Sequence, residues 1–226
     1  MISDIYTIFV EESAGIDFAC RSGCSTCCTR SVNLTTAEGR LIVDFLHKTG
    51  KGLPDLPRDQ VLLRPTLTGN GLASLYLSGK EFEPEAEAPW LFEPCFFLQD
   101  NLCTIYPVRP FACRSFNSTV ICAQSEVAEA PDWLITLAIV TNQLLEDLDR
   151  GGWWGNLADV LSFLDATNEE TASMAAQERL LPTQPLPGLL VVPQERPLIN
   201  RFLVKVRERT GYTPASLSVT GTDTLS

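Results

Sequence analysis

The cysteines constrain this chain more than any other feature, because all eight fall into two groups. Cys20, Cys24, Cys27 and Cys28 form the first group, and Cys95, Cys103, Cys113 and Cys122 form the second. Tight spacing of this kind makes eight unrelated buried thiols an improbable alternative, although single free cysteines are common in protein cores. Two groups separated by a long insert are typical of a metal site assembled from two parts of a chain.

The spacing within the first group indicates more than one centre. Cys24-x-x-Cys27 is the spacing of a metal knuckle, and Gly23 can supply its tight turn. Cys27 and Cys28 are adjacent, and neighbouring side chains tend to diverge, so both do not easily bind one mononuclear ion. The pattern therefore favours two four-cysteine centres or one multinuclear cluster.

The other residue types narrow the choice of metal. His47 is the only histidine, and a surface or core role is the expected one for it. Thiolates without imidazole select zinc or iron–sulfur chemistry over magnesium, calcium or a non-haem iron site. Arg109 and Arg114 flank Cys113 and are candidates to bind the cofactor by offsetting its negative charge or donating hydrogen bonds. Surface salt bridges are the equally weighted alternative for both arginines.

Composition excludes some partners and compartments. The formal charge of −11 and the pI of about 4.6 disfavour nucleic acid and anionic membranes as partners. Residues 1–19 lack a basic region, a long apolar run and a cleavage-site pattern, so we expect no signal peptide. The most apolar run, 133–140, is too short for a membrane span. We therefore expect a cytoplasmic protein with reduced thiols and an unidentified protein or redox partner.

Hydrophobic periodicity and end signals predict a mainly helical chain. Thr35-x-x-Glu38 is a capping-box pattern, and Gln99-Asp100-Asn101 reads as a tight hairpin turn that would bring Cys95 close to Cys103. Residues 72–77 are predicted as a strand or a short buried segment. The predicted helices cover 4–13, 36–49, 58–63, 131–149 (the core helix), 156–166, 168–180 and 196–209.

Two further stretches leave alternatives open. Trp153-Trp154 is predicted to pack at a helix junction, with an exposed aromatic contact patch as the alternative. The basic side chains of the last helix, Arg201 to Arg209, either form a solvated face or recruit an acidic partner. The fold prediction is one mainly α domain over 1–212 with cysteine-bearing loops and one small β-hairpin. It comprises a cysteine-cluster region at 18–122 and a helical part at 131–210, followed by a loose tail at 213–226.

The motifs Cys20-x(3)-Cys24-x-x-Cys27-Cys28 and Cys103-x-Ile105-Tyr106-x-x-Arg109-Pro110-x-x-Cys113-Arg114 resemble the YkgJ-type cysteine-cluster family, over about residues 18–122. That family is described as zinc- or iron-chelating, and many members are labelled Fe–S oxidoreductases. The resemblance implies that all eight cysteines are metal ligands. The family's commonest pattern has two residues between the first two cysteines, where this chain has three.

Three functions follow as hypotheses. The preferred one is an iron–sulfur protein with a redox or cluster-carrier role. The second is a structural zinc protein that acts as an adaptor or binding module, because closed four-coordinate sites leave no position for a substrate. The third is a metal-dependent modifying enzyme. What counts against this hypothesis is that the sequence shows no separate acid–base or nucleophile constellation.

Overall fold

The computed structural model describes residues 1–21, 23–56, 65–83, 89–125, 127–165 and 177–217. Within these ranges the chain forms eight α-helices and two small antiparallel sheets, which confirms the mainly α prediction with a small hairpin. No helix among the described residues has the length and apolar character needed to cross a membrane. The predicted short helix at 58–63 and most of the predicted helix at 168–180 lie outside the described residues.

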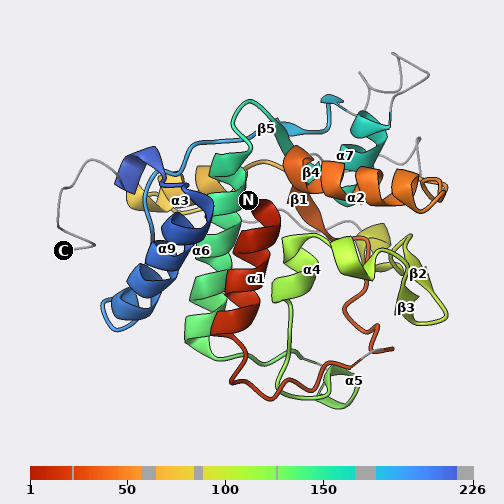
Figure 1. The fold of residues 1–226 in the computed structure, drawn as a ribbon, viewed down its shortest axis with the longest axis horizontal. Helices are drawn as coiled ribbons and strands as arrows, with labels where there is room; N and C mark the ends of the chain where they lie inside the picture. Colours follow the sequence, from red (N-terminus) through yellow and green to blue (C-terminus); the bar gives the residue numbers. More distant parts are fainter. Residues whose placement is uncertain (22, 57–64, 84–88, 126, 166–176, 218–226) are drawn as a thin grey trace.

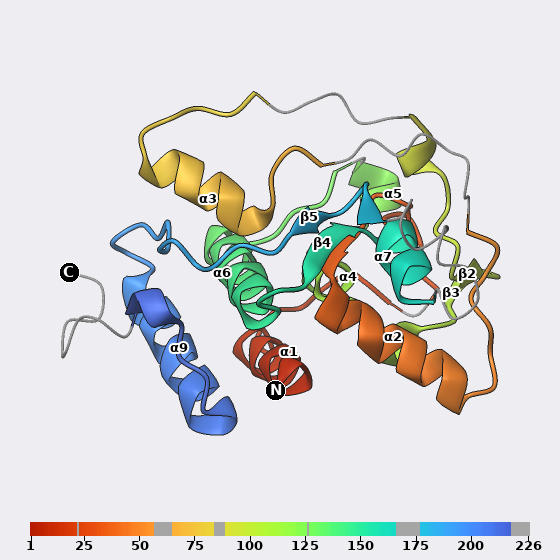
Figure 2. The same ribbon diagram turned by 90° about the horizontal axis from the view of Figure 1, so that it is seen from above.

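The helical half of the molecule is built around α6 (Asp132–Leu148), as the apolar pattern predicts. Helices α1 (Ile2–Glu12) and α3 (Gly69–Leu77) pack against α6, and α9 (Arg196–Thr210) packs against α1 (Figures 1 and 2). The fully buried side chains between them include Ile5, Leu144 and Phe202. We call these four helices, α1, α3, α6 and α9, the helical half.

A second core lies beside the helical half, between α2 (Thr36–Lys48) and α7 (Leu157–Leu164). The two helices pack closely at Gly39, where an added Cβ would lie 2.7 Å from carbon atoms of Val160 and Leu164. A three-stranded sheet of order β1-β4-β5 adjoins them, with β1 at Asn33–Thr35, β4 at Trp153–Asn156 and β5 at Leu181–Pro182. Both helices begin directly after a strand of this sheet.

The predicted hairpin is confirmed as β2 (Leu98–Gln99) and β3 (Leu102–Cys103). Its turn residues Asp100 and Asn101 both have positive φ, 49° and 60°. Positive φ at both central positions is what a two-residue type I′ hairpin turn requires, and Asp and Asn tolerate it better than most residues. Short helices complete this part of the chain: η1 (Pro89–Phe92), η2 (Tyr106–Val108), α4 (Phe111–Ser115) and α5 (Cys122–Ser125).

Residues 72–77 belong to helix α3, so the prediction of a strand there is wrong. The side chain of Thr68 caps this helix by accepting the N–H of Gly71 at 3.0 Å, and Gly79, with a φ of +72°, follows its end. Caps at both ends favour a helix over a strand. The backbone N–H of Asn70 also donates to the buried Glu146 of α6, which holds α3 on the helical half.

The structure also bears on three other predicted features. Trp153 is packed edge-on against Phe163, but in strand β4 rather than at a helix junction. The basic side chains of α9 pair with the protein itself, because Lys205 and Arg201 contact Glu12 and Arg209 contacts Glu11. Residues Ala215–Leu217 form a short 3-10 helix, η3, within the predicted tail.

Candidate metal centre

The loop that carries the first cysteine group is held by backbone hydrogen bonds to the second group. The N–H of Cys95 donates to the carbonyl of Cys28 at 2.9 Å, and Thr29 pairs with Pro94 as an isolated bridge. The N–H of Arg30 donates to the carbonyl of Glu93 at 3.0 Å. Two stretches far apart in sequence therefore lie side by side at Cys28 and Cys95.

The hairpin positions Cys95 and Cys103. Leu98 pairs with Cys103 across the two strands, and its N–H donates to the carbonyl of Cys95 at 3.0 Å. Each sulfur also accepts a backbone hydrogen bond from two residues further along, from Phe97 for Cys95 and from Ile105 for Cys103, and these bonds lower the pKa of the two thiols. Burial has the larger, opposite effect and raises both pKa values. Backbone donors to sulfur stabilise thiolates, as metal ligation requires.

Helix α4 positions Cys113 and is itself held by Glu38. This buried carboxylate accepts the N–H of Phe111 at 2.9 Å and the hydroxyl of Tyr6 at 2.6 Å. It also closes the predicted capping box with Thr35 at the start of α2. Phe111 packs into the core of the helical half, with its ring stacked on Tyr6 and edge-on to Phe9. Glu38 therefore ties Cys113 to both α1 and α2.

Electrostatic effects link five of the thiols. A hydrogen bond with Cys27 lowers the pKa of Cys28, and the charges of Cys113, Cys103 and Cys95 act against this shift. The charges of Cys95, Cys103 and Cys27 contribute to the raised pKa of Cys113. Burial is the largest influence on Cys113 and raises its pKa to about 12. We call the following group the five-thiol cluster: Cys27, Cys28, Cys95, Cys103 and Cys113.

The adjacent thiols of Cys27 and Cys28 interact with each other. A hydrogen bond joins the two sulfur groups, and it lowers the pKa of Cys28 while it raises that of Cys27. Cys27 is exposed, whereas Cys28 and the three thiols of the second group in the cluster are half-buried.

Cys20 and Cys122 contact a segment that is organised by Ser118. The sulfur of Cys20 accepts the N–H of Ser118 at 3.4 Å, and the thiol of Cys122 lies 3.9 Å from the carbonyl oxygen of Val120. Ser118 is buried, and its hydroxyl donates to Val120 at 2.8 Å and accepts the N–H of Glu129 at 3.1 Å. Cys24 is exposed in the turn between Cys20 and Cys27.

The two predicted cofactor-binding arginines have different surroundings. The guanidinium carbon of Arg109 lies 3.9 Å from the centre of the Tyr106 ring, and its charge partly offsets the effects that raise the pKa of Cys27, Cys103 and Cys113. Its Nε atom is buried and has no hydrogen-bond partner among the described residues. Arg114 instead donates to the carbonyls of Arg109 and Pro107.

The donor set fits a thiophilic metal or an iron–sulfur cluster, since it combines half-buried thiols, backbone N–H groups aimed at sulfur and an unpartnered arginine donor. Within the described part of the chain, no three His, Cys, Asp or Glu side chains are grouped closely enough to hold one metal ion. His47, exposed near the end of α2, is no part of this arrangement.

A family model described as "Putative zinc- or iron-chelating domain" matches residues 19–133. The chain belongs to this CxxCxxCC family. The match covers just over half of the 226 residues and contains all eight cysteines. Membership confirms the predicted resemblance and supports metal binding by the cysteine cluster. No curated protein and no solved structure matches the chain.

Three residues that position the site were not found from the sequence. Glu38 is readable as a capping-box residue, but its bonds to Tyr6 and Phe111 are long-range and leave no local signal. Ser118 carries no pattern at all. Arg30, which follows the first cysteine group, contacts the Phe96 ring at 4.3 Å and lowers the pKa of Cys95. Its proximity to the cysteines, like that of Arg109, was the one available sign.

Proposed function

We propose that this chain holds an iron–sulfur cluster and serves as a redox protein or cluster carrier. The observation that carries the proposal is the arrangement around Arg109. The charge of Arg109 acts on three of the thiols, Cys27, Cys103 and Cys113, and its buried Nε donor lacks an acceptor among the described residues. The five-thiol cluster has one more thiol than a single tetrahedral ion can bind. A cluster with thiolate ligands carries negative charge and sulfide acceptors, which complement an arginine.

The three cysteines outside the five-thiol cluster support a second metal centre or a set of additional ligands. Cys20, Cys24 and Cys122 complete the eight cysteines, and Cys20 and Cys122 already lie on one short segment around Ser118. Together with a thiol of the adjacent pair they would make a second set of four. We propose this assignment of all eight cysteines as metal ligands, with Arg109 as the arginine beside the cluster.

A structural zinc site is the second candidate. The observation that favours it is that exactly four members of the five-thiol cluster are half-buried: Cys28, Cys95, Cys103 and Cys113. Four thiolates make a closed tetrahedral zinc site with no open position, and the exposed Cys27 would then be a spare. Such a chain would act as a binding module whose loops the metal holds in place.

The deciding experiment is the content of iron, zinc and acid-labile sulfide in protein purified without oxygen, with a visible spectrum. Iron with sulfide, and absorbance that dithionite bleaches reversibly, is the expected result. Zinc without sulfide would contradict the iron–sulfur proposal and support the structural site. Transfer of the cluster to an apo-ferredoxin would then separate a carrier from an electron-transfer protein.

Cysteine variants test the ligand assignment. Cys113→Ser should remove most of the metal of the five-thiol cluster, whereas Cys20→Ser should leave that metal in place and remove only the second centre. Ser115→Ala is the matched control in the same short helix, since its side chain bonds only the carbonyl of Ala112. Full metal content in Cys113→Ser would refute the assignment.

A further inference from the structure

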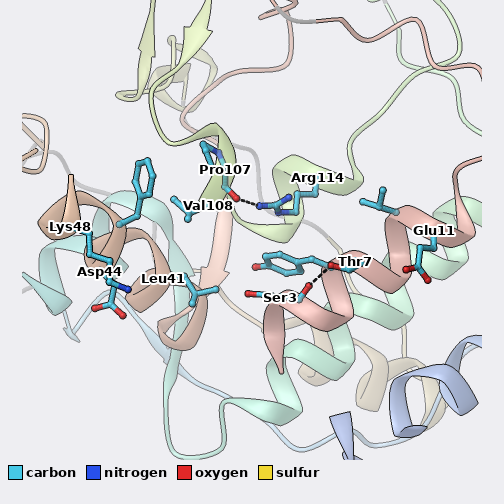
Figure 3. Close-up of a pocket in the computed structure, with 12 residues that line it drawn as sticks. Ser3, Thr7, Glu11, Leu41, Asp44, Lys48, Pro107, Val108 and Arg114 are labelled. Atoms are coloured by element: carbon cyan, nitrogen blue, oxygen red, sulfur yellow. Dashed lines mark hydrogen bonds between the residues drawn. The ribbon is translucent and has the colours of Figure 1, made fainter. Parts of the chain in front are cut away.

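A pocket of about 480 Å³ lies between α1, α2 and the segment from Pro107 to Arg114 (Figure 3). This volume falls within the range of small-ligand sites, ~300–1,000 Å³. Much of its wall is apolar, formed by the side chains of Tyr6, Val10, Leu41, Phe45 and Val108. None of the eight cysteines lines it, so the pocket is separate from the metal centre, although Arg114 follows Cys113 directly.

Arg114 is held in this wall by the protein backbone. Its Nε donates to the carbonyl of Arg109 at 2.9 Å and its Nη2 to the carbonyl of Pro107 at 2.6 Å, while the guanidinium carbon lies 4.7 Å from the centre of the Tyr6 ring. Three contacts therefore fix the orientation of the group. The Nη1 atom of Arg114 donates to neither of these two carbonyls.

The charge of Arg114 has no carboxylate partner among the residues that the structure describes. Its neighbours do little to compensate it, since Arg109 is a like charge and burial lowers its pKa. The groups whose negative charge would act on it are two tyrosines, Tyr6 and Tyr106, and the thiol of Cys113 in the proposed metal centre. An unpaired guanidinium in the wall of a pocket is a candidate group for binding an anion, and it stands out in a protein with a net charge of −11.

The remaining charged side chains of the pocket do not compete for that role. Glu11 is paired with Arg209 through two hydrogen bonds of 2.8 and 2.7 Å. Asp44 and Lys48 are exposed on α2. The hydroxyl of Tyr6 is already donated to Glu38. A single oriented guanidinium above an apolar wall matches a singly charged ligand better than a phosphate ester, which carries more charge and needs more donors.

We propose that this pocket binds a small carboxylate with an apolar body. The carboxylate would accept hydrogen bonds from the free Nη1 end of Arg114, and the apolar body would lie against Val10, Leu41 and Phe45. The proposal is independent of which metal the cysteines hold. It adds a ligand site beside the short helix that carries Cys113.

Titration of the metal-loaded protein with hexanoate and with hexanamide, followed by amide NMR shifts, tests the proposal. Hexanoate should bind saturably with a Kd on the order of 1 mM, with shifts at residues 3–11, 41–48 and 107–114. The neutral amide should bind at least about tenfold weaker, because it cannot form the charged pair with arginine. Equal affinity of acid and amide, or no saturable binding of hexanoate, would overturn the proposal.

Two variants locate the site. Arg114→Gln should abolish the preference for the acid over the amide. Val10→Trp should block both ligands by filling the pocket, and it should fold normally because Val10 is 53% exposed. The metal content of each variant is measured alongside, so that a loss of the centre is not mistaken for a loss of the pocket. Unchanged hexanoate binding in either folded variant would assign the shifts to another surface.

Discussion

The helical half and the cysteine loops solve the problem of buried polar groups in opposite ways. Three carboxylates near the end of α6, Glu146, Asp147 and Asp149, are buried and accept hydrogen bonds from the protein itself. The thiols of the five-thiol cluster are half-buried or exposed, and the Nε of Arg109 has no described partner. The comparison teaches that the helical half is complete as a folded chain, whereas the cysteine loops are completed by a bound group.

Metal removal should produce the largest difference between the cysteine loops and the helical half. After a chelator strips the metal without oxygen, amide exchange should accelerate by about tenfold or more in residues 23–32 and 91–113, because binding energy there is folding energy. Exchange in α6 and α9 should change little. Hydrogen-exchange mass spectrometry compares the two regions in one sample. Uniform acceleration throughout the chain would show that the two regions are not separate in this sense.

Removal of a carboxylate tests the helical half. Glu146 accepts the N–H of Asn70 and the N–H of Gln184, each at 2.8 Å. Glu146→Ala leaves the buried N–H of Asn70 and the part-buried N–H of Gln184 without their acceptor and should cost about 3 kcal/mol in the free energy of unfolding, measured with urea. Glu146→Gln, the control, keeps one acceptor and should cost less. Metal content should not change in either variant, and a parallel loss of metal would contradict the separation.

Glu38 joins the two regions, so its removal should affect both. Glu38→Ala should cost about 2–3 kcal/mol in stability and also lower the metal content, since Phe111 and hence Cys113 lose their anchor. Thr35→Ala is the control, because it removes only the helix cap and should cost about 1 kcal/mol with full metal content. Equal metal loss in both variants would make the cap, rather than the contact with α4, the important feature.

The pH dependence of stability gives a smaller effect in the helical half. Burial raises the pKa of Glu146 above its ordinary value of 4.5. The folded state therefore holds this proton more tightly than the unfolded chain, and its contribution to stability falls as pH rises from 4.5 through the raised pKa. The difference in unfolding free energy between wild type and Glu146→Gln should change in that direction over the interval. A flat difference would mean that Glu146 titrates normally.

The smallest effect is expected from the ion pairs between α1 and α9. Arg209 and Glu11 are both exposed, so Arg209→Ala should leave the melting temperature nearly unchanged in low and high salt. Lys205→Ala should have a larger effect, since its partner Glu12 is only 5% exposed. If Arg209→Ala were the more destabilising of the two, burial would not govern these pairs.

The sequence predicted what short-range patterns determine. Helices α1, α2, α6 and α9 follow from their apolar periodicity and caps, and the hairpin follows from its polar turn. The three-stranded sheet was missed because its strands have only two to four residues. The pairing of β1 with β4 is also long-range, since Asn33 lies opposite Asn156. Such short strands carry no periodicity, and only tertiary packing selects them.

The candidate site divides in the same way. The grouping of cysteines was readable from spacing, and the approach of Cys95 to Cys103 from the hairpin turn. The contact of Cys20 with Ser118 was not readable, because it depends on a segment that the buried hydroxyl of Ser118 organises through hydrogen bonds. The distinct roles of Arg109 and Arg114 were equally hidden, since each is decided by backbone carbonyls and rings rather than by sequence distance.

The backbone pairing of Cys28 with Cys95 has a consequence for how the protein is made. Cys95 is synthesised 67 residues after Cys28, an interval of about 3–13 s at ordinary elongation rates of ~5–20 residues per second. For that time the nascent chain presents four closely spaced thiols that lack the partners contributed by residues 93–95 and 113. Delivery of the native metal or cluster therefore belongs after synthesis of the second group, and a cell must protect the first group from oxidation and from the wrong metal until then.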